Sequence, residues 1–174
     1  MKRLATLGFF LVSLIVFAQP PEGEMLNFFG KVTKMTIQDS VEKPLDGVLV
    51  EFWSNGKLIG STTTAQKGKY SLNLPFQVSY TVMYKSQGLV TKLIEVNVEK
   101  FFDEAEKNML KMQIDVALFR NDGFADLEFL STEPVAKATY IPRKKTLVWD
   151  EKYHQSMKHK VVDVLKKYDT AAKK

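Results

Sequence analysis

The chain has 174 residues, no cysteine and a formal net charge of +5. The absence of cysteine excludes a disulfide framework, a thiolate metal site, a cysteine nucleophile and a lipidated mature N-terminus. The basic excess is mild, and the length suffices for one hydrophobic core but not for two.

Residues 1–18 have the layout of a secretory signal peptide. Lys2 and Arg3 precede an apolar run, Leu4–Phe17, that is too short for a comfortable membrane span, and small residues lie at the −3 and −1 positions before a cut after Ala18. Cleavage would leave 156 residues with a charge of +3, and a retained anchor is the alternative. Export without cysteine fits the periplasm of a Gram-negative bacterium and argues against nucleic acid as a partner.

After a flexible lead over 19–27, residues 28–120 are expected to form a β-sandwich. The first strand is Phe28–Met35. Two further β-type runs, Val48–Trp53 and Leu58–Thr64, lie on either side of Asn55-Gly56, a pair typical of a type I′ turn. Alternation places three side chains of the first run on one face: Val48, Val50 and Phe52.

Four more segments continue this pattern at turn spacings of about ten residues, the spacing typical of a β-sandwich. They are Tyr70–Leu74, ended by Pro75, then Val78–Tyr84, Leu89–Val98 and the closing strand Met112–Phe119. In Leu89–Val98 we expect Val90, Ile94, Val96 and Val98 to face inward. We expect Lys92 and Asn97 to lie on the side that faces solvent. In the closing strand the inward residues are Ile114, Val116 and Leu118.

The last third has a different pattern. Residues 121–149 are predicted to be an irregular extension with room for one short strand at 138–141, because prolines interrupt it. Asp150 is a suitable N-cap for a helix over 150–169, which a tail over 170–174 follows.

Apolar residues recur along this helix at helical spacing. One interpretation docks the stripe on the sandwich, and the other makes it a partner-binding face. The candidate partner-binding residues are Trp149, Tyr153, Met157, Val161, Leu165 and Tyr168.

Candidate metal chemistry is weak, and we expect neither metal nor cofactor. His154 and His159 are five residues apart, about 140° around a helix, whereas a zinc pair takes i and i+4. Asn121-Asp122-Gly123, with Asp126 and Glu128, lacks the ligand spacing of a calcium loop and is expected to be a turn.

Four segments carry a family resemblance in order and spacing: Phe29–Val32, Pro44–Phe52, Gly68–Pro75 and Tyr80–Val82. Over about Phe28–Val98 the chain resembles the carboxypeptidase regulatory-like domain, in the form exported by Bacteroidota. The resemblance implies a seven-stranded, prealbumin-like Greek-key sandwich. It also implies a folding and interaction module without catalytic residues.

A hydrolase on the prealbumin-like fold is the enzyme alternative. Its site uses histidines and an arginine on the sandwich, with a Tyr-Arg-Gly-Ser-type C-terminus. This chain has no histidine between Phe28 and Leu118 and ends in Ala171–Lys174, so we expect a non-enzyme.

The sequence therefore predicts a non-catalytic periplasmic accessory or scaffold protein. Its expected partners are proteins of an outer-membrane assembly, secretion or motility machine, which it would join through the sandwich and the C-terminal extension. It is not expected to be an integral membrane protein. A glycan- or peptidoglycan-binding module is the alternative, with an aromatic platform drawn from Trp53, Tyr140, Trp149 and Tyr153.

Overall fold

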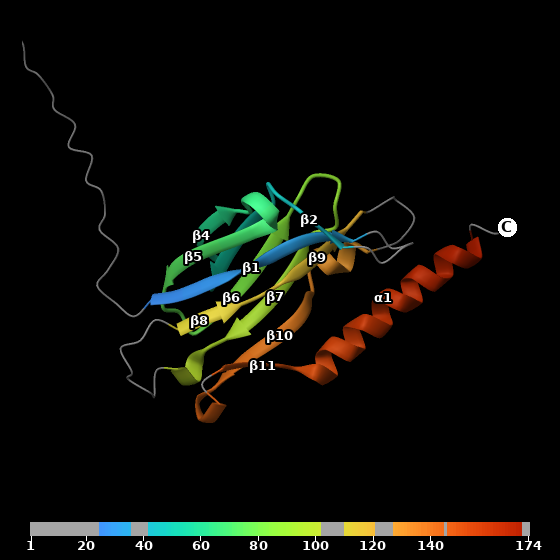
Figure 1. Ribbon diagram of the computed structural model, residues 1–174. Helices are drawn as coiled ribbons and strands as arrows, with labels where there is room; N and C mark the ends of the chain where they lie inside the picture. The colour runs from blue at the N-terminus through green and yellow to red at the C-terminus, as the bar shows by residue number, and fades with distance from the viewer. Residues whose placement is uncertain (1–24, 36–41, 102–109, 121–126, 145, 172–174) are drawn as a thin grey trace, which may run out of the picture.

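Two β-sheets lie face to face, and one long helix runs along one side of them (Figure 1). The computed structural model describes residues 25–35, 42–101, 110–120, 127–144 and 146–171. The protein is mainly β and consistent with a β-sandwich, as predicted. The signal peptide expected at 1–18 lies outside the described residues, and its cleavage stays a prediction.

The smaller sheet is built around β1. This strand pairs antiparallel with β2 and β5 and parallel with β8 and β9. The strands of this sheet are β1 (Met25–Met35), β2 (Glu42–Pro44), β5 (Lys69–Pro75), β8 (Leu110–Gln113) and β9 (Val116–Phe119).

The larger sheet has the strand order β11-β10-β7-β6-β3-β4. Its strands are β3 (Leu49–Ser54), β4 (Lys57–Thr63), β6 (Ser79–Lys85), β7 (Lys92–Asn97), β10 (Pro134–Ile141) and β11 (Thr146–Trp149). Short 3-10 turns connect several strands: η1 (Gln66–Gly68), η2 (Glu99–Phe101), η3 (Glu128–Ser131) and η4 (Pro142–Lys144).

The predicted hairpin between β3 and β4 is confirmed. Asn55 and Gly56 have φ values of 49° and 73°, the positive pair that a type I′ turn requires, and Ser54 pairs with Lys57 across it. Within β3, Val50 and Phe52 are fully buried, as is Val48 just before it. Period-two alternation was therefore sufficient to identify the inner face of this strand.

The main core lies between the sheets. The Phe28 ring centroid is 5.0 Å from those of both Phe52 and Tyr80, so β1 is joined to β3 and β6 across the interface. The residues expected to face inward from Leu89–Val98 and from the closing strand are buried: Val90, Ile94, Val96, Val98, Ile114, Val116 and Leu118. Burial of this apolar surface is the main stabilising contribution, because the chain has no disulfide.

Two boundaries in the first part differ from prediction. The flexible lead over 19–27 is corrected at its end, because Met25–Asn27 belong to β1 and Leu26 is fully buried. The closing strand is divided into β8 and β9. At the division, Ile114 O accepts a hydrogen bond from the Tyr70 hydroxyl, and Asp115 Oδ1 accepts one from Lys31 N, so side chains replace part of the ladder.

The irregular extension expected over 121–149 is corrected in part: the short strand expected at 138–141 lies within β10, which begins earlier, at Pro134, and 121–126 lie outside the described residues. β10 pairs parallel with β7 and antiparallel with β11, so the extension adds two strands to the larger sheet. The physical reason is that small and aromatic side chains, Ala138 and Tyr140, continue the buried inner face. The described residues contain eleven strands, against the seven expected.

Helix α1 (Glu151–Ala171) begins where predicted and ends two residues later than the expected 169. Tyr153 N donates to Asp150 Oδ1 at 3.0 Å, which is the predicted N-cap contact. None of the helices in the described part of the chain combines the length and the apolar content needed to cross a membrane.

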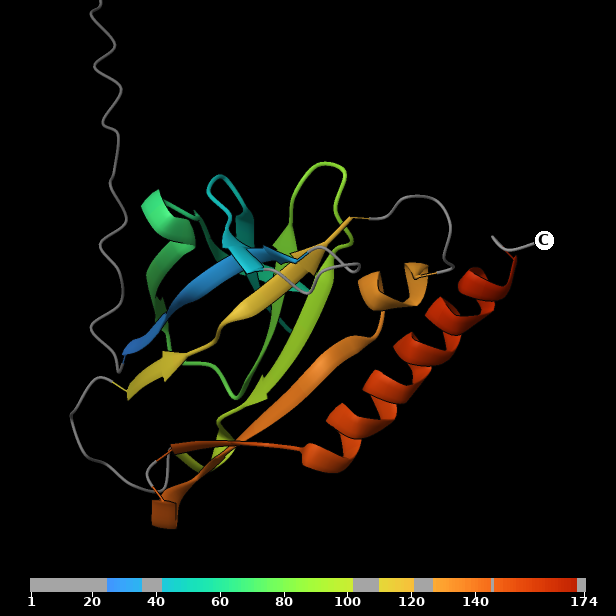
Figure 2. The same ribbon diagram turned by 45° about the vertical axis from the view of Figure 1, so that its right-hand side comes forward.

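The helix docks through a second, smaller cluster, here termed the minor core. Figure 2 shows η3 between the sheets and α1. The minor core consists of Val90, Phe119, Leu127, Leu130 and Met157, with half-buried Tyr153, Val161 and Val164 against it. Two polar contacts reinforce the docking: the Tyr153 hydroxyl donates to Pro134 O at 2.8 Å, and Lys160 pairs with Glu133 at 2.7 Å.

Candidate functional site

A groove lies on the side of the sandwich where the larger sheet extends past the smaller one. The smaller sheet ends at β8 and β9, whereas the larger continues from β7 into β10 and β11. The resulting hollow measures about 680 Å³. It is lined by Lys92, Ile94, Gln113, Asp115, Val116, Ala117, Val135, Ala136, Trp149, Glu151 and His154.

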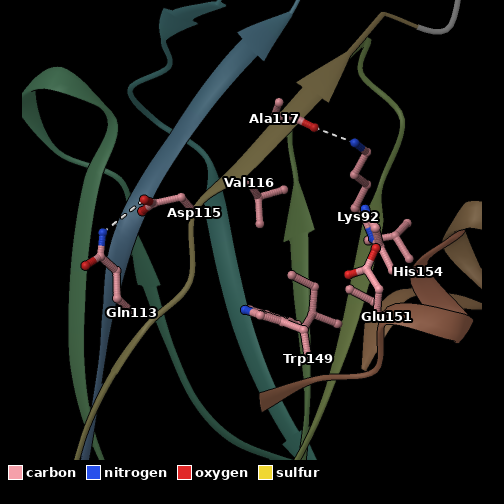
Figure 3. Close-up of a pocket in the computed structure, with 11 residues that line it drawn as sticks. Lys92, Gln113, Asp115, Val116, Ala117, Trp149, Glu151 and His154 are labelled. Carbon is pink, nitrogen blue, oxygen red and sulfur yellow. Dashed lines mark hydrogen bonds between the residues drawn. The ribbon is translucent and has the colours of Figure 1, made fainter. Parts of the chain in front are cut away.

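Lys92 is the most unusual residue of this groove. Its Nζ donates a hydrogen bond to Ala117 O and lies 4.7 Å from the ring centroid of Phe119 (Figure 3). No ion pair of Lys92 is found among the described residues. Burial lowers the pKa of the ammonium to about 8, and the charge of Glu42 only partly opposes this shift.

The two acidic side chains of the groove are held by neighbouring polar groups. Asp115 accepts hydrogen bonds from Lys31 N at 2.8 Å and from Gln113 Nε2 at 2.9 Å. Glu151 Oε1 accepts one from Gln155 Nε2 at 2.6 Å, within α1. Both carboxylates are on exposed residues, where solvent screens their charge.

Trp149 supplies the largest exposed apolar surface of the groove. The residue ends β11 and is 41% exposed. Figure 3 shows Trp149 among the side chains that line this hollow, together with Lys92, Glu151 and His154. The groove thus offers an aromatic surface, a shielded cation and a strand edge within one hollow.

The predicted partner-binding stripe is divided between two environments. Trp149 lies in the groove, whereas Met157 is 6% exposed in the minor core, with Tyr153 and Val161 against it. Leu165 and Tyr168 lie on α1, but their side chains are outside the described set. The described helical part of the stripe therefore packs against the sandwich, as the first of the two interpretations expected.

The aromatic residues considered for a glycan platform do not come together. Tyr140 is buried, and the Tyr153 hydroxyl is bonded to Pro134 O. Trp53 donates to Glu51 and lies on β3, four strands from β11, a separation of about 19 Å at normal strand spacing. Only Trp149 of the four contributes to the groove.

The histidines and acidic residues also remain apart. Only His154 of the two histidines lines the groove, and both are exposed on α1. The described residues contain no group of three or more His, Asp or Glu side chains that could hold a metal ion. The turn around Asp122 falls outside the described residues.

Sequence reasoning assigned Lys92 to the wrong face. Lys92 has the same parity as Val90, Ile94 and Val96, so strict alternation turns it inward, and it pairs with buried Tyr84 across the ladder. The polar character of lysine outweighed this signal in the prediction. Its groove contacts with Ala117 depend on residue pairings that the sequence did not reveal.

The polar groups of the groove make hydrogen bonds of one kind. The hydrogen bonds of Asp115, Glu151 and Lys92 go to backbone or amide groups, rather than joining a nucleophile to a base. The shielded ammonium favours an anionic ligand group, and Trp149 favours an apolar or planar one.

No protein-family model matches this sequence, and a search of curated proteins finds no similar sequence. Solved structures with partial likeness include 3-chlorocatechol 1,2-dioxygenase from Rhodococcus opacus 1CP, with 13% identity, a TM-score of 0.42 and coverage of 57% of this chain and 61% of that one. Another is catechol 1,2-dioxygenase from Acinetobacter sp. ADP1, with 15% identity, a TM-score of 0.41 and coverage of 59% and 55%.

A third is the dioxygenase domain of a dioxygenase carbohydrate-binding protein fusion from Streptomyces sp. SirexAA-E, with 16% identity, a TM-score of 0.39 and coverage of 62% of this chain and 86% of that one. The chain spans about three fifths of the length of the Rhodococcus enzyme. Likeness at this level carries no inference about activity.

Proposed function

We propose that this protein is a non-catalytic binding module that acts as an accessory or scaffold subunit in the periplasm. It would serve an outer-membrane assembly, secretion or motility machine of the Bacteroidota type. The observation that carries the proposal is the groove between β8–β9 and β10–β11, where exposed Trp149 and shielded Lys92 lie in one hollow. Exposed aromatic surface beside placed polar groups is typical of a recognition site.

The strand order supports the proposed membership in the carboxypeptidase regulatory-like family. With β2, β10 and β11 set aside and β8 and β9 counted as one strand, seven strands form the arrangements β5-β1-β8/β9 and β4-β3-β6-β7. Consecutive strands such as β4 and β5 lie in different sheets, as in a Greek-key sandwich. In this proposal, β10, β11 and α1 are additions that turn a generic sandwich into a specific binding module.

The test is capture of a defined partner. The full-length tagged protein would be crosslinked in cells, recovered from the envelope fraction and identified by mass spectrometry, beside a Trp149→Ala variant. We expect crosslinks from groove residues to one envelope protein, and their loss in the variant. Recovery of the wild-type protein alone, as a monomer, would count against the proposal.

A peptidoglycan- or glycan-binding role is the competing function. Trp149 is the one observation that favours it, because a sugar face stacks on an exposed indole. Titration of the Trp53→Phe variant with peptidoglycan fragments isolates the fluorescence of Trp149. A shift at millimolar fragment would favour the glycan role, and an unchanged spectrum would exclude it.

A further inference from the structure

We propose that the groove binds an extended segment of a partner protein and places an acidic side chain of that segment against Lys92 Nζ. This inference rests on the proposed binding function and specifies the chemistry of the partner. Three features carry it: a lysine without a counter-ion among the described residues, a backbone amide of β9 that faces the groove, and an exposed indole in the same hollow.

The first feature is the charge of Lys92. An ammonium has three donors, and among the described residues its only hydrogen-bond acceptor is Ala117 O. The Phe119 ring shields it further, and no carboxylate of the described residues lies within ion-pair distance. A shielded cation without a counter-ion favours an anion that arrives with the ligand, because the pair forms where water screens it little.

The charged groups around Lys92 do not serve as its counter-ion. On α1, Glu151 is bonded to Gln155, and exposed His154 lines the groove beside it. Between β8 and β9, both oxygens of Asp115 accept hydrogen bonds. Glu42 on β2 acts on Lys92 only through its more distant charge. None of these groups pairs with Lys92, so its charge has no direct counter-ion among the described residues, and a ligand carboxylate would supply one.

The second feature is the backbone of β9. Ile114 N donates to Phe29 O on the β1 side, whereas Phe119 O accepts from Val90 N on the opposite side. Successive residues of a strand turn their amides to alternate sides, so Ala117 shares the orientation of Phe119 and faces the groove. The carbonyls of Ala117 and Phe119 already accept from Lys92 Nζ and Val90 N, whereas no partner of the Ala117 N–H is found on this side among the described residues. An extended chain in the groove could therefore accept a main-chain hydrogen bond from this amide, as in strand addition.

The third feature distinguishes a peptide from a free carboxylate. Trp149 lies across the hollow from β9, so a ligand that reaches both Lys92 and Trp149 must extend along the groove. An extended peptide carries an acidic side chain and an apolar one within a few residues, at about 3.3 Å per residue. A sugar acid could reach Lys92 but has no repeating amides for the Ala117 edge.

The test uses two pools of N-acetylated, C-amidated, fluorescein-labelled nonapeptides with randomised flanks, one with a central glutamate and one with a central glutamine. Fluorescence anisotropy measures their binding to the full chain. We expect the glutamate pool to bind at least about ten-fold more tightly, and Lys92→Met to abolish this preference. Lys57→Met, an exposed lysine at the β3–β4 turn, is the matched control and should retain it.

A second measurement does not depend on the folding of a variant. In wild-type protein labelled with ¹⁵N-lysine, the glutamate pool should raise the pKa of Lys92, and the glutamine pool should leave it unchanged. Equal binding of the two pools, or none at about 1 mM, overturns the inference. Binding of tri-galacturonate that depends on Lys92, without any peptide preference, overturns it in favour of a sugar acid.

Failure of the inference can be separated from failure of the proposed function. If Lys92→Met and the wild type crosslink to the same envelope partner equally well, the binding function stands and the acidic segment is excluded. If neither protein captures a partner but the glutamate preference is present, the groove chemistry stands and the envelope role fails.

Discussion

Lys92 shows how one shielded side chain affects the whole protein. Its pKa is about 8 in the folded state and about 10.4 in an unfolded chain. Between these values the unfolded chain binds more protons, so the free energy of unfolding increases as the pH rises. Below pH 8 the ammonium is charged in both the folded and the unfolded state, so its effect on the free energy of unfolding is a constant cost of burying the charge.

We therefore predict that Lys92 contributes a rise of about 2 kcal/mol in the free energy of unfolding between pH 8 and pH 10. From about pH 9 upward Tyr70, Tyr80 and Tyr84 oppose this rise, because burial raises their pKa and the unfolded tyrosines lose protons first. Urea denaturation followed by tryptophan fluorescence measures this profile. Lys92→Met should flatten the rise, and Lys57→Met should not. An unchanged profile in Lys92→Met would show that the ammonium is solvated.

Gly30 is a second residue whose effect is larger than its size. It lies inside β1, and an added Cβ would lie 2.0 Å from Ile114 O. Gly30→Ala should cost about 3 kcal/mol or more, because the parallel pairing with β8 and β9 would have to shift. Gly56→Ala, with φ of +73° and open space around it, should cost only about 1 kcal/mol. Thermal unfolding compares the two, and similar losses would contradict the close-approach argument.

At the scale of elements, the sequence predicted the turns and helix ends that depend only on neighbouring residues. Asn55-Gly56 identified a turn because its positive φ values are intrinsic to those residues, and Asp150 identified a helix start because its carboxylate caps nearby amides. In the extension the strand at 138–141 was predicted, but its start at Pro134 was not, because residues such as Ala136 are paired with β7. Residue pairings of this kind depend on tertiary context that a propensity does not contain.

The same limit applied to the site. The sequence identified Trp149 as a binding candidate but grouped it with Met157, because both fit one helical stripe. The structure separates them, since the chain leaves β11 at Trp149 and begins α1 only at Glu151. Lys92 followed the strand alternation that the sequence already contained, and its role was missed because its polarity was given more weight than its position.

The docking of α1 leads to a prediction for Met157. Its truncation to alanine should destabilise the protein by about 2 kcal/mol, because the buried side chain fills the minor core. Lys158→Ala, an exposed neighbour on the same helix, should change stability by less than about 0.5 kcal/mol. Urea denaturation measures both. Equal, small effects would mean that the helix is held by a partner rather than by the sandwich.

For the whole molecule, the structure makes the C-terminal extension part of the domain. β10 covers the edge of β7, and η3 and α1 cover Val90 and Phe119. Residues 28–120 alone would expose that edge and those apolar side chains to water, conditions that promote aggregation.

We predict that a chain ending at Arg120 is aggregated or lacks fixed tertiary structure, whereas one ending at Trp149 keeps the sheet signals but loses stability. Near-UV circular dichroism and amide NMR spectra compare the two with the full chain. A native-like spectrum for the chain ending at Arg120 would show that the seven-stranded unit is autonomous.

The parallel pairing of β1 with β8 and β9 also determines an order of events. Lys31 N finds its acceptor on Asp115, 84 residues later, so the first strand made is among the last to find its partners. Contacts of such sequence separation slow folding toward the millisecond-to-second range of all-β domains. Until β8 and β9 are made, β1 lacks these two neighbours, and its apolar side chains Leu26 and Phe28 are not yet fully buried. We therefore expect chaperones to bind this segment during synthesis.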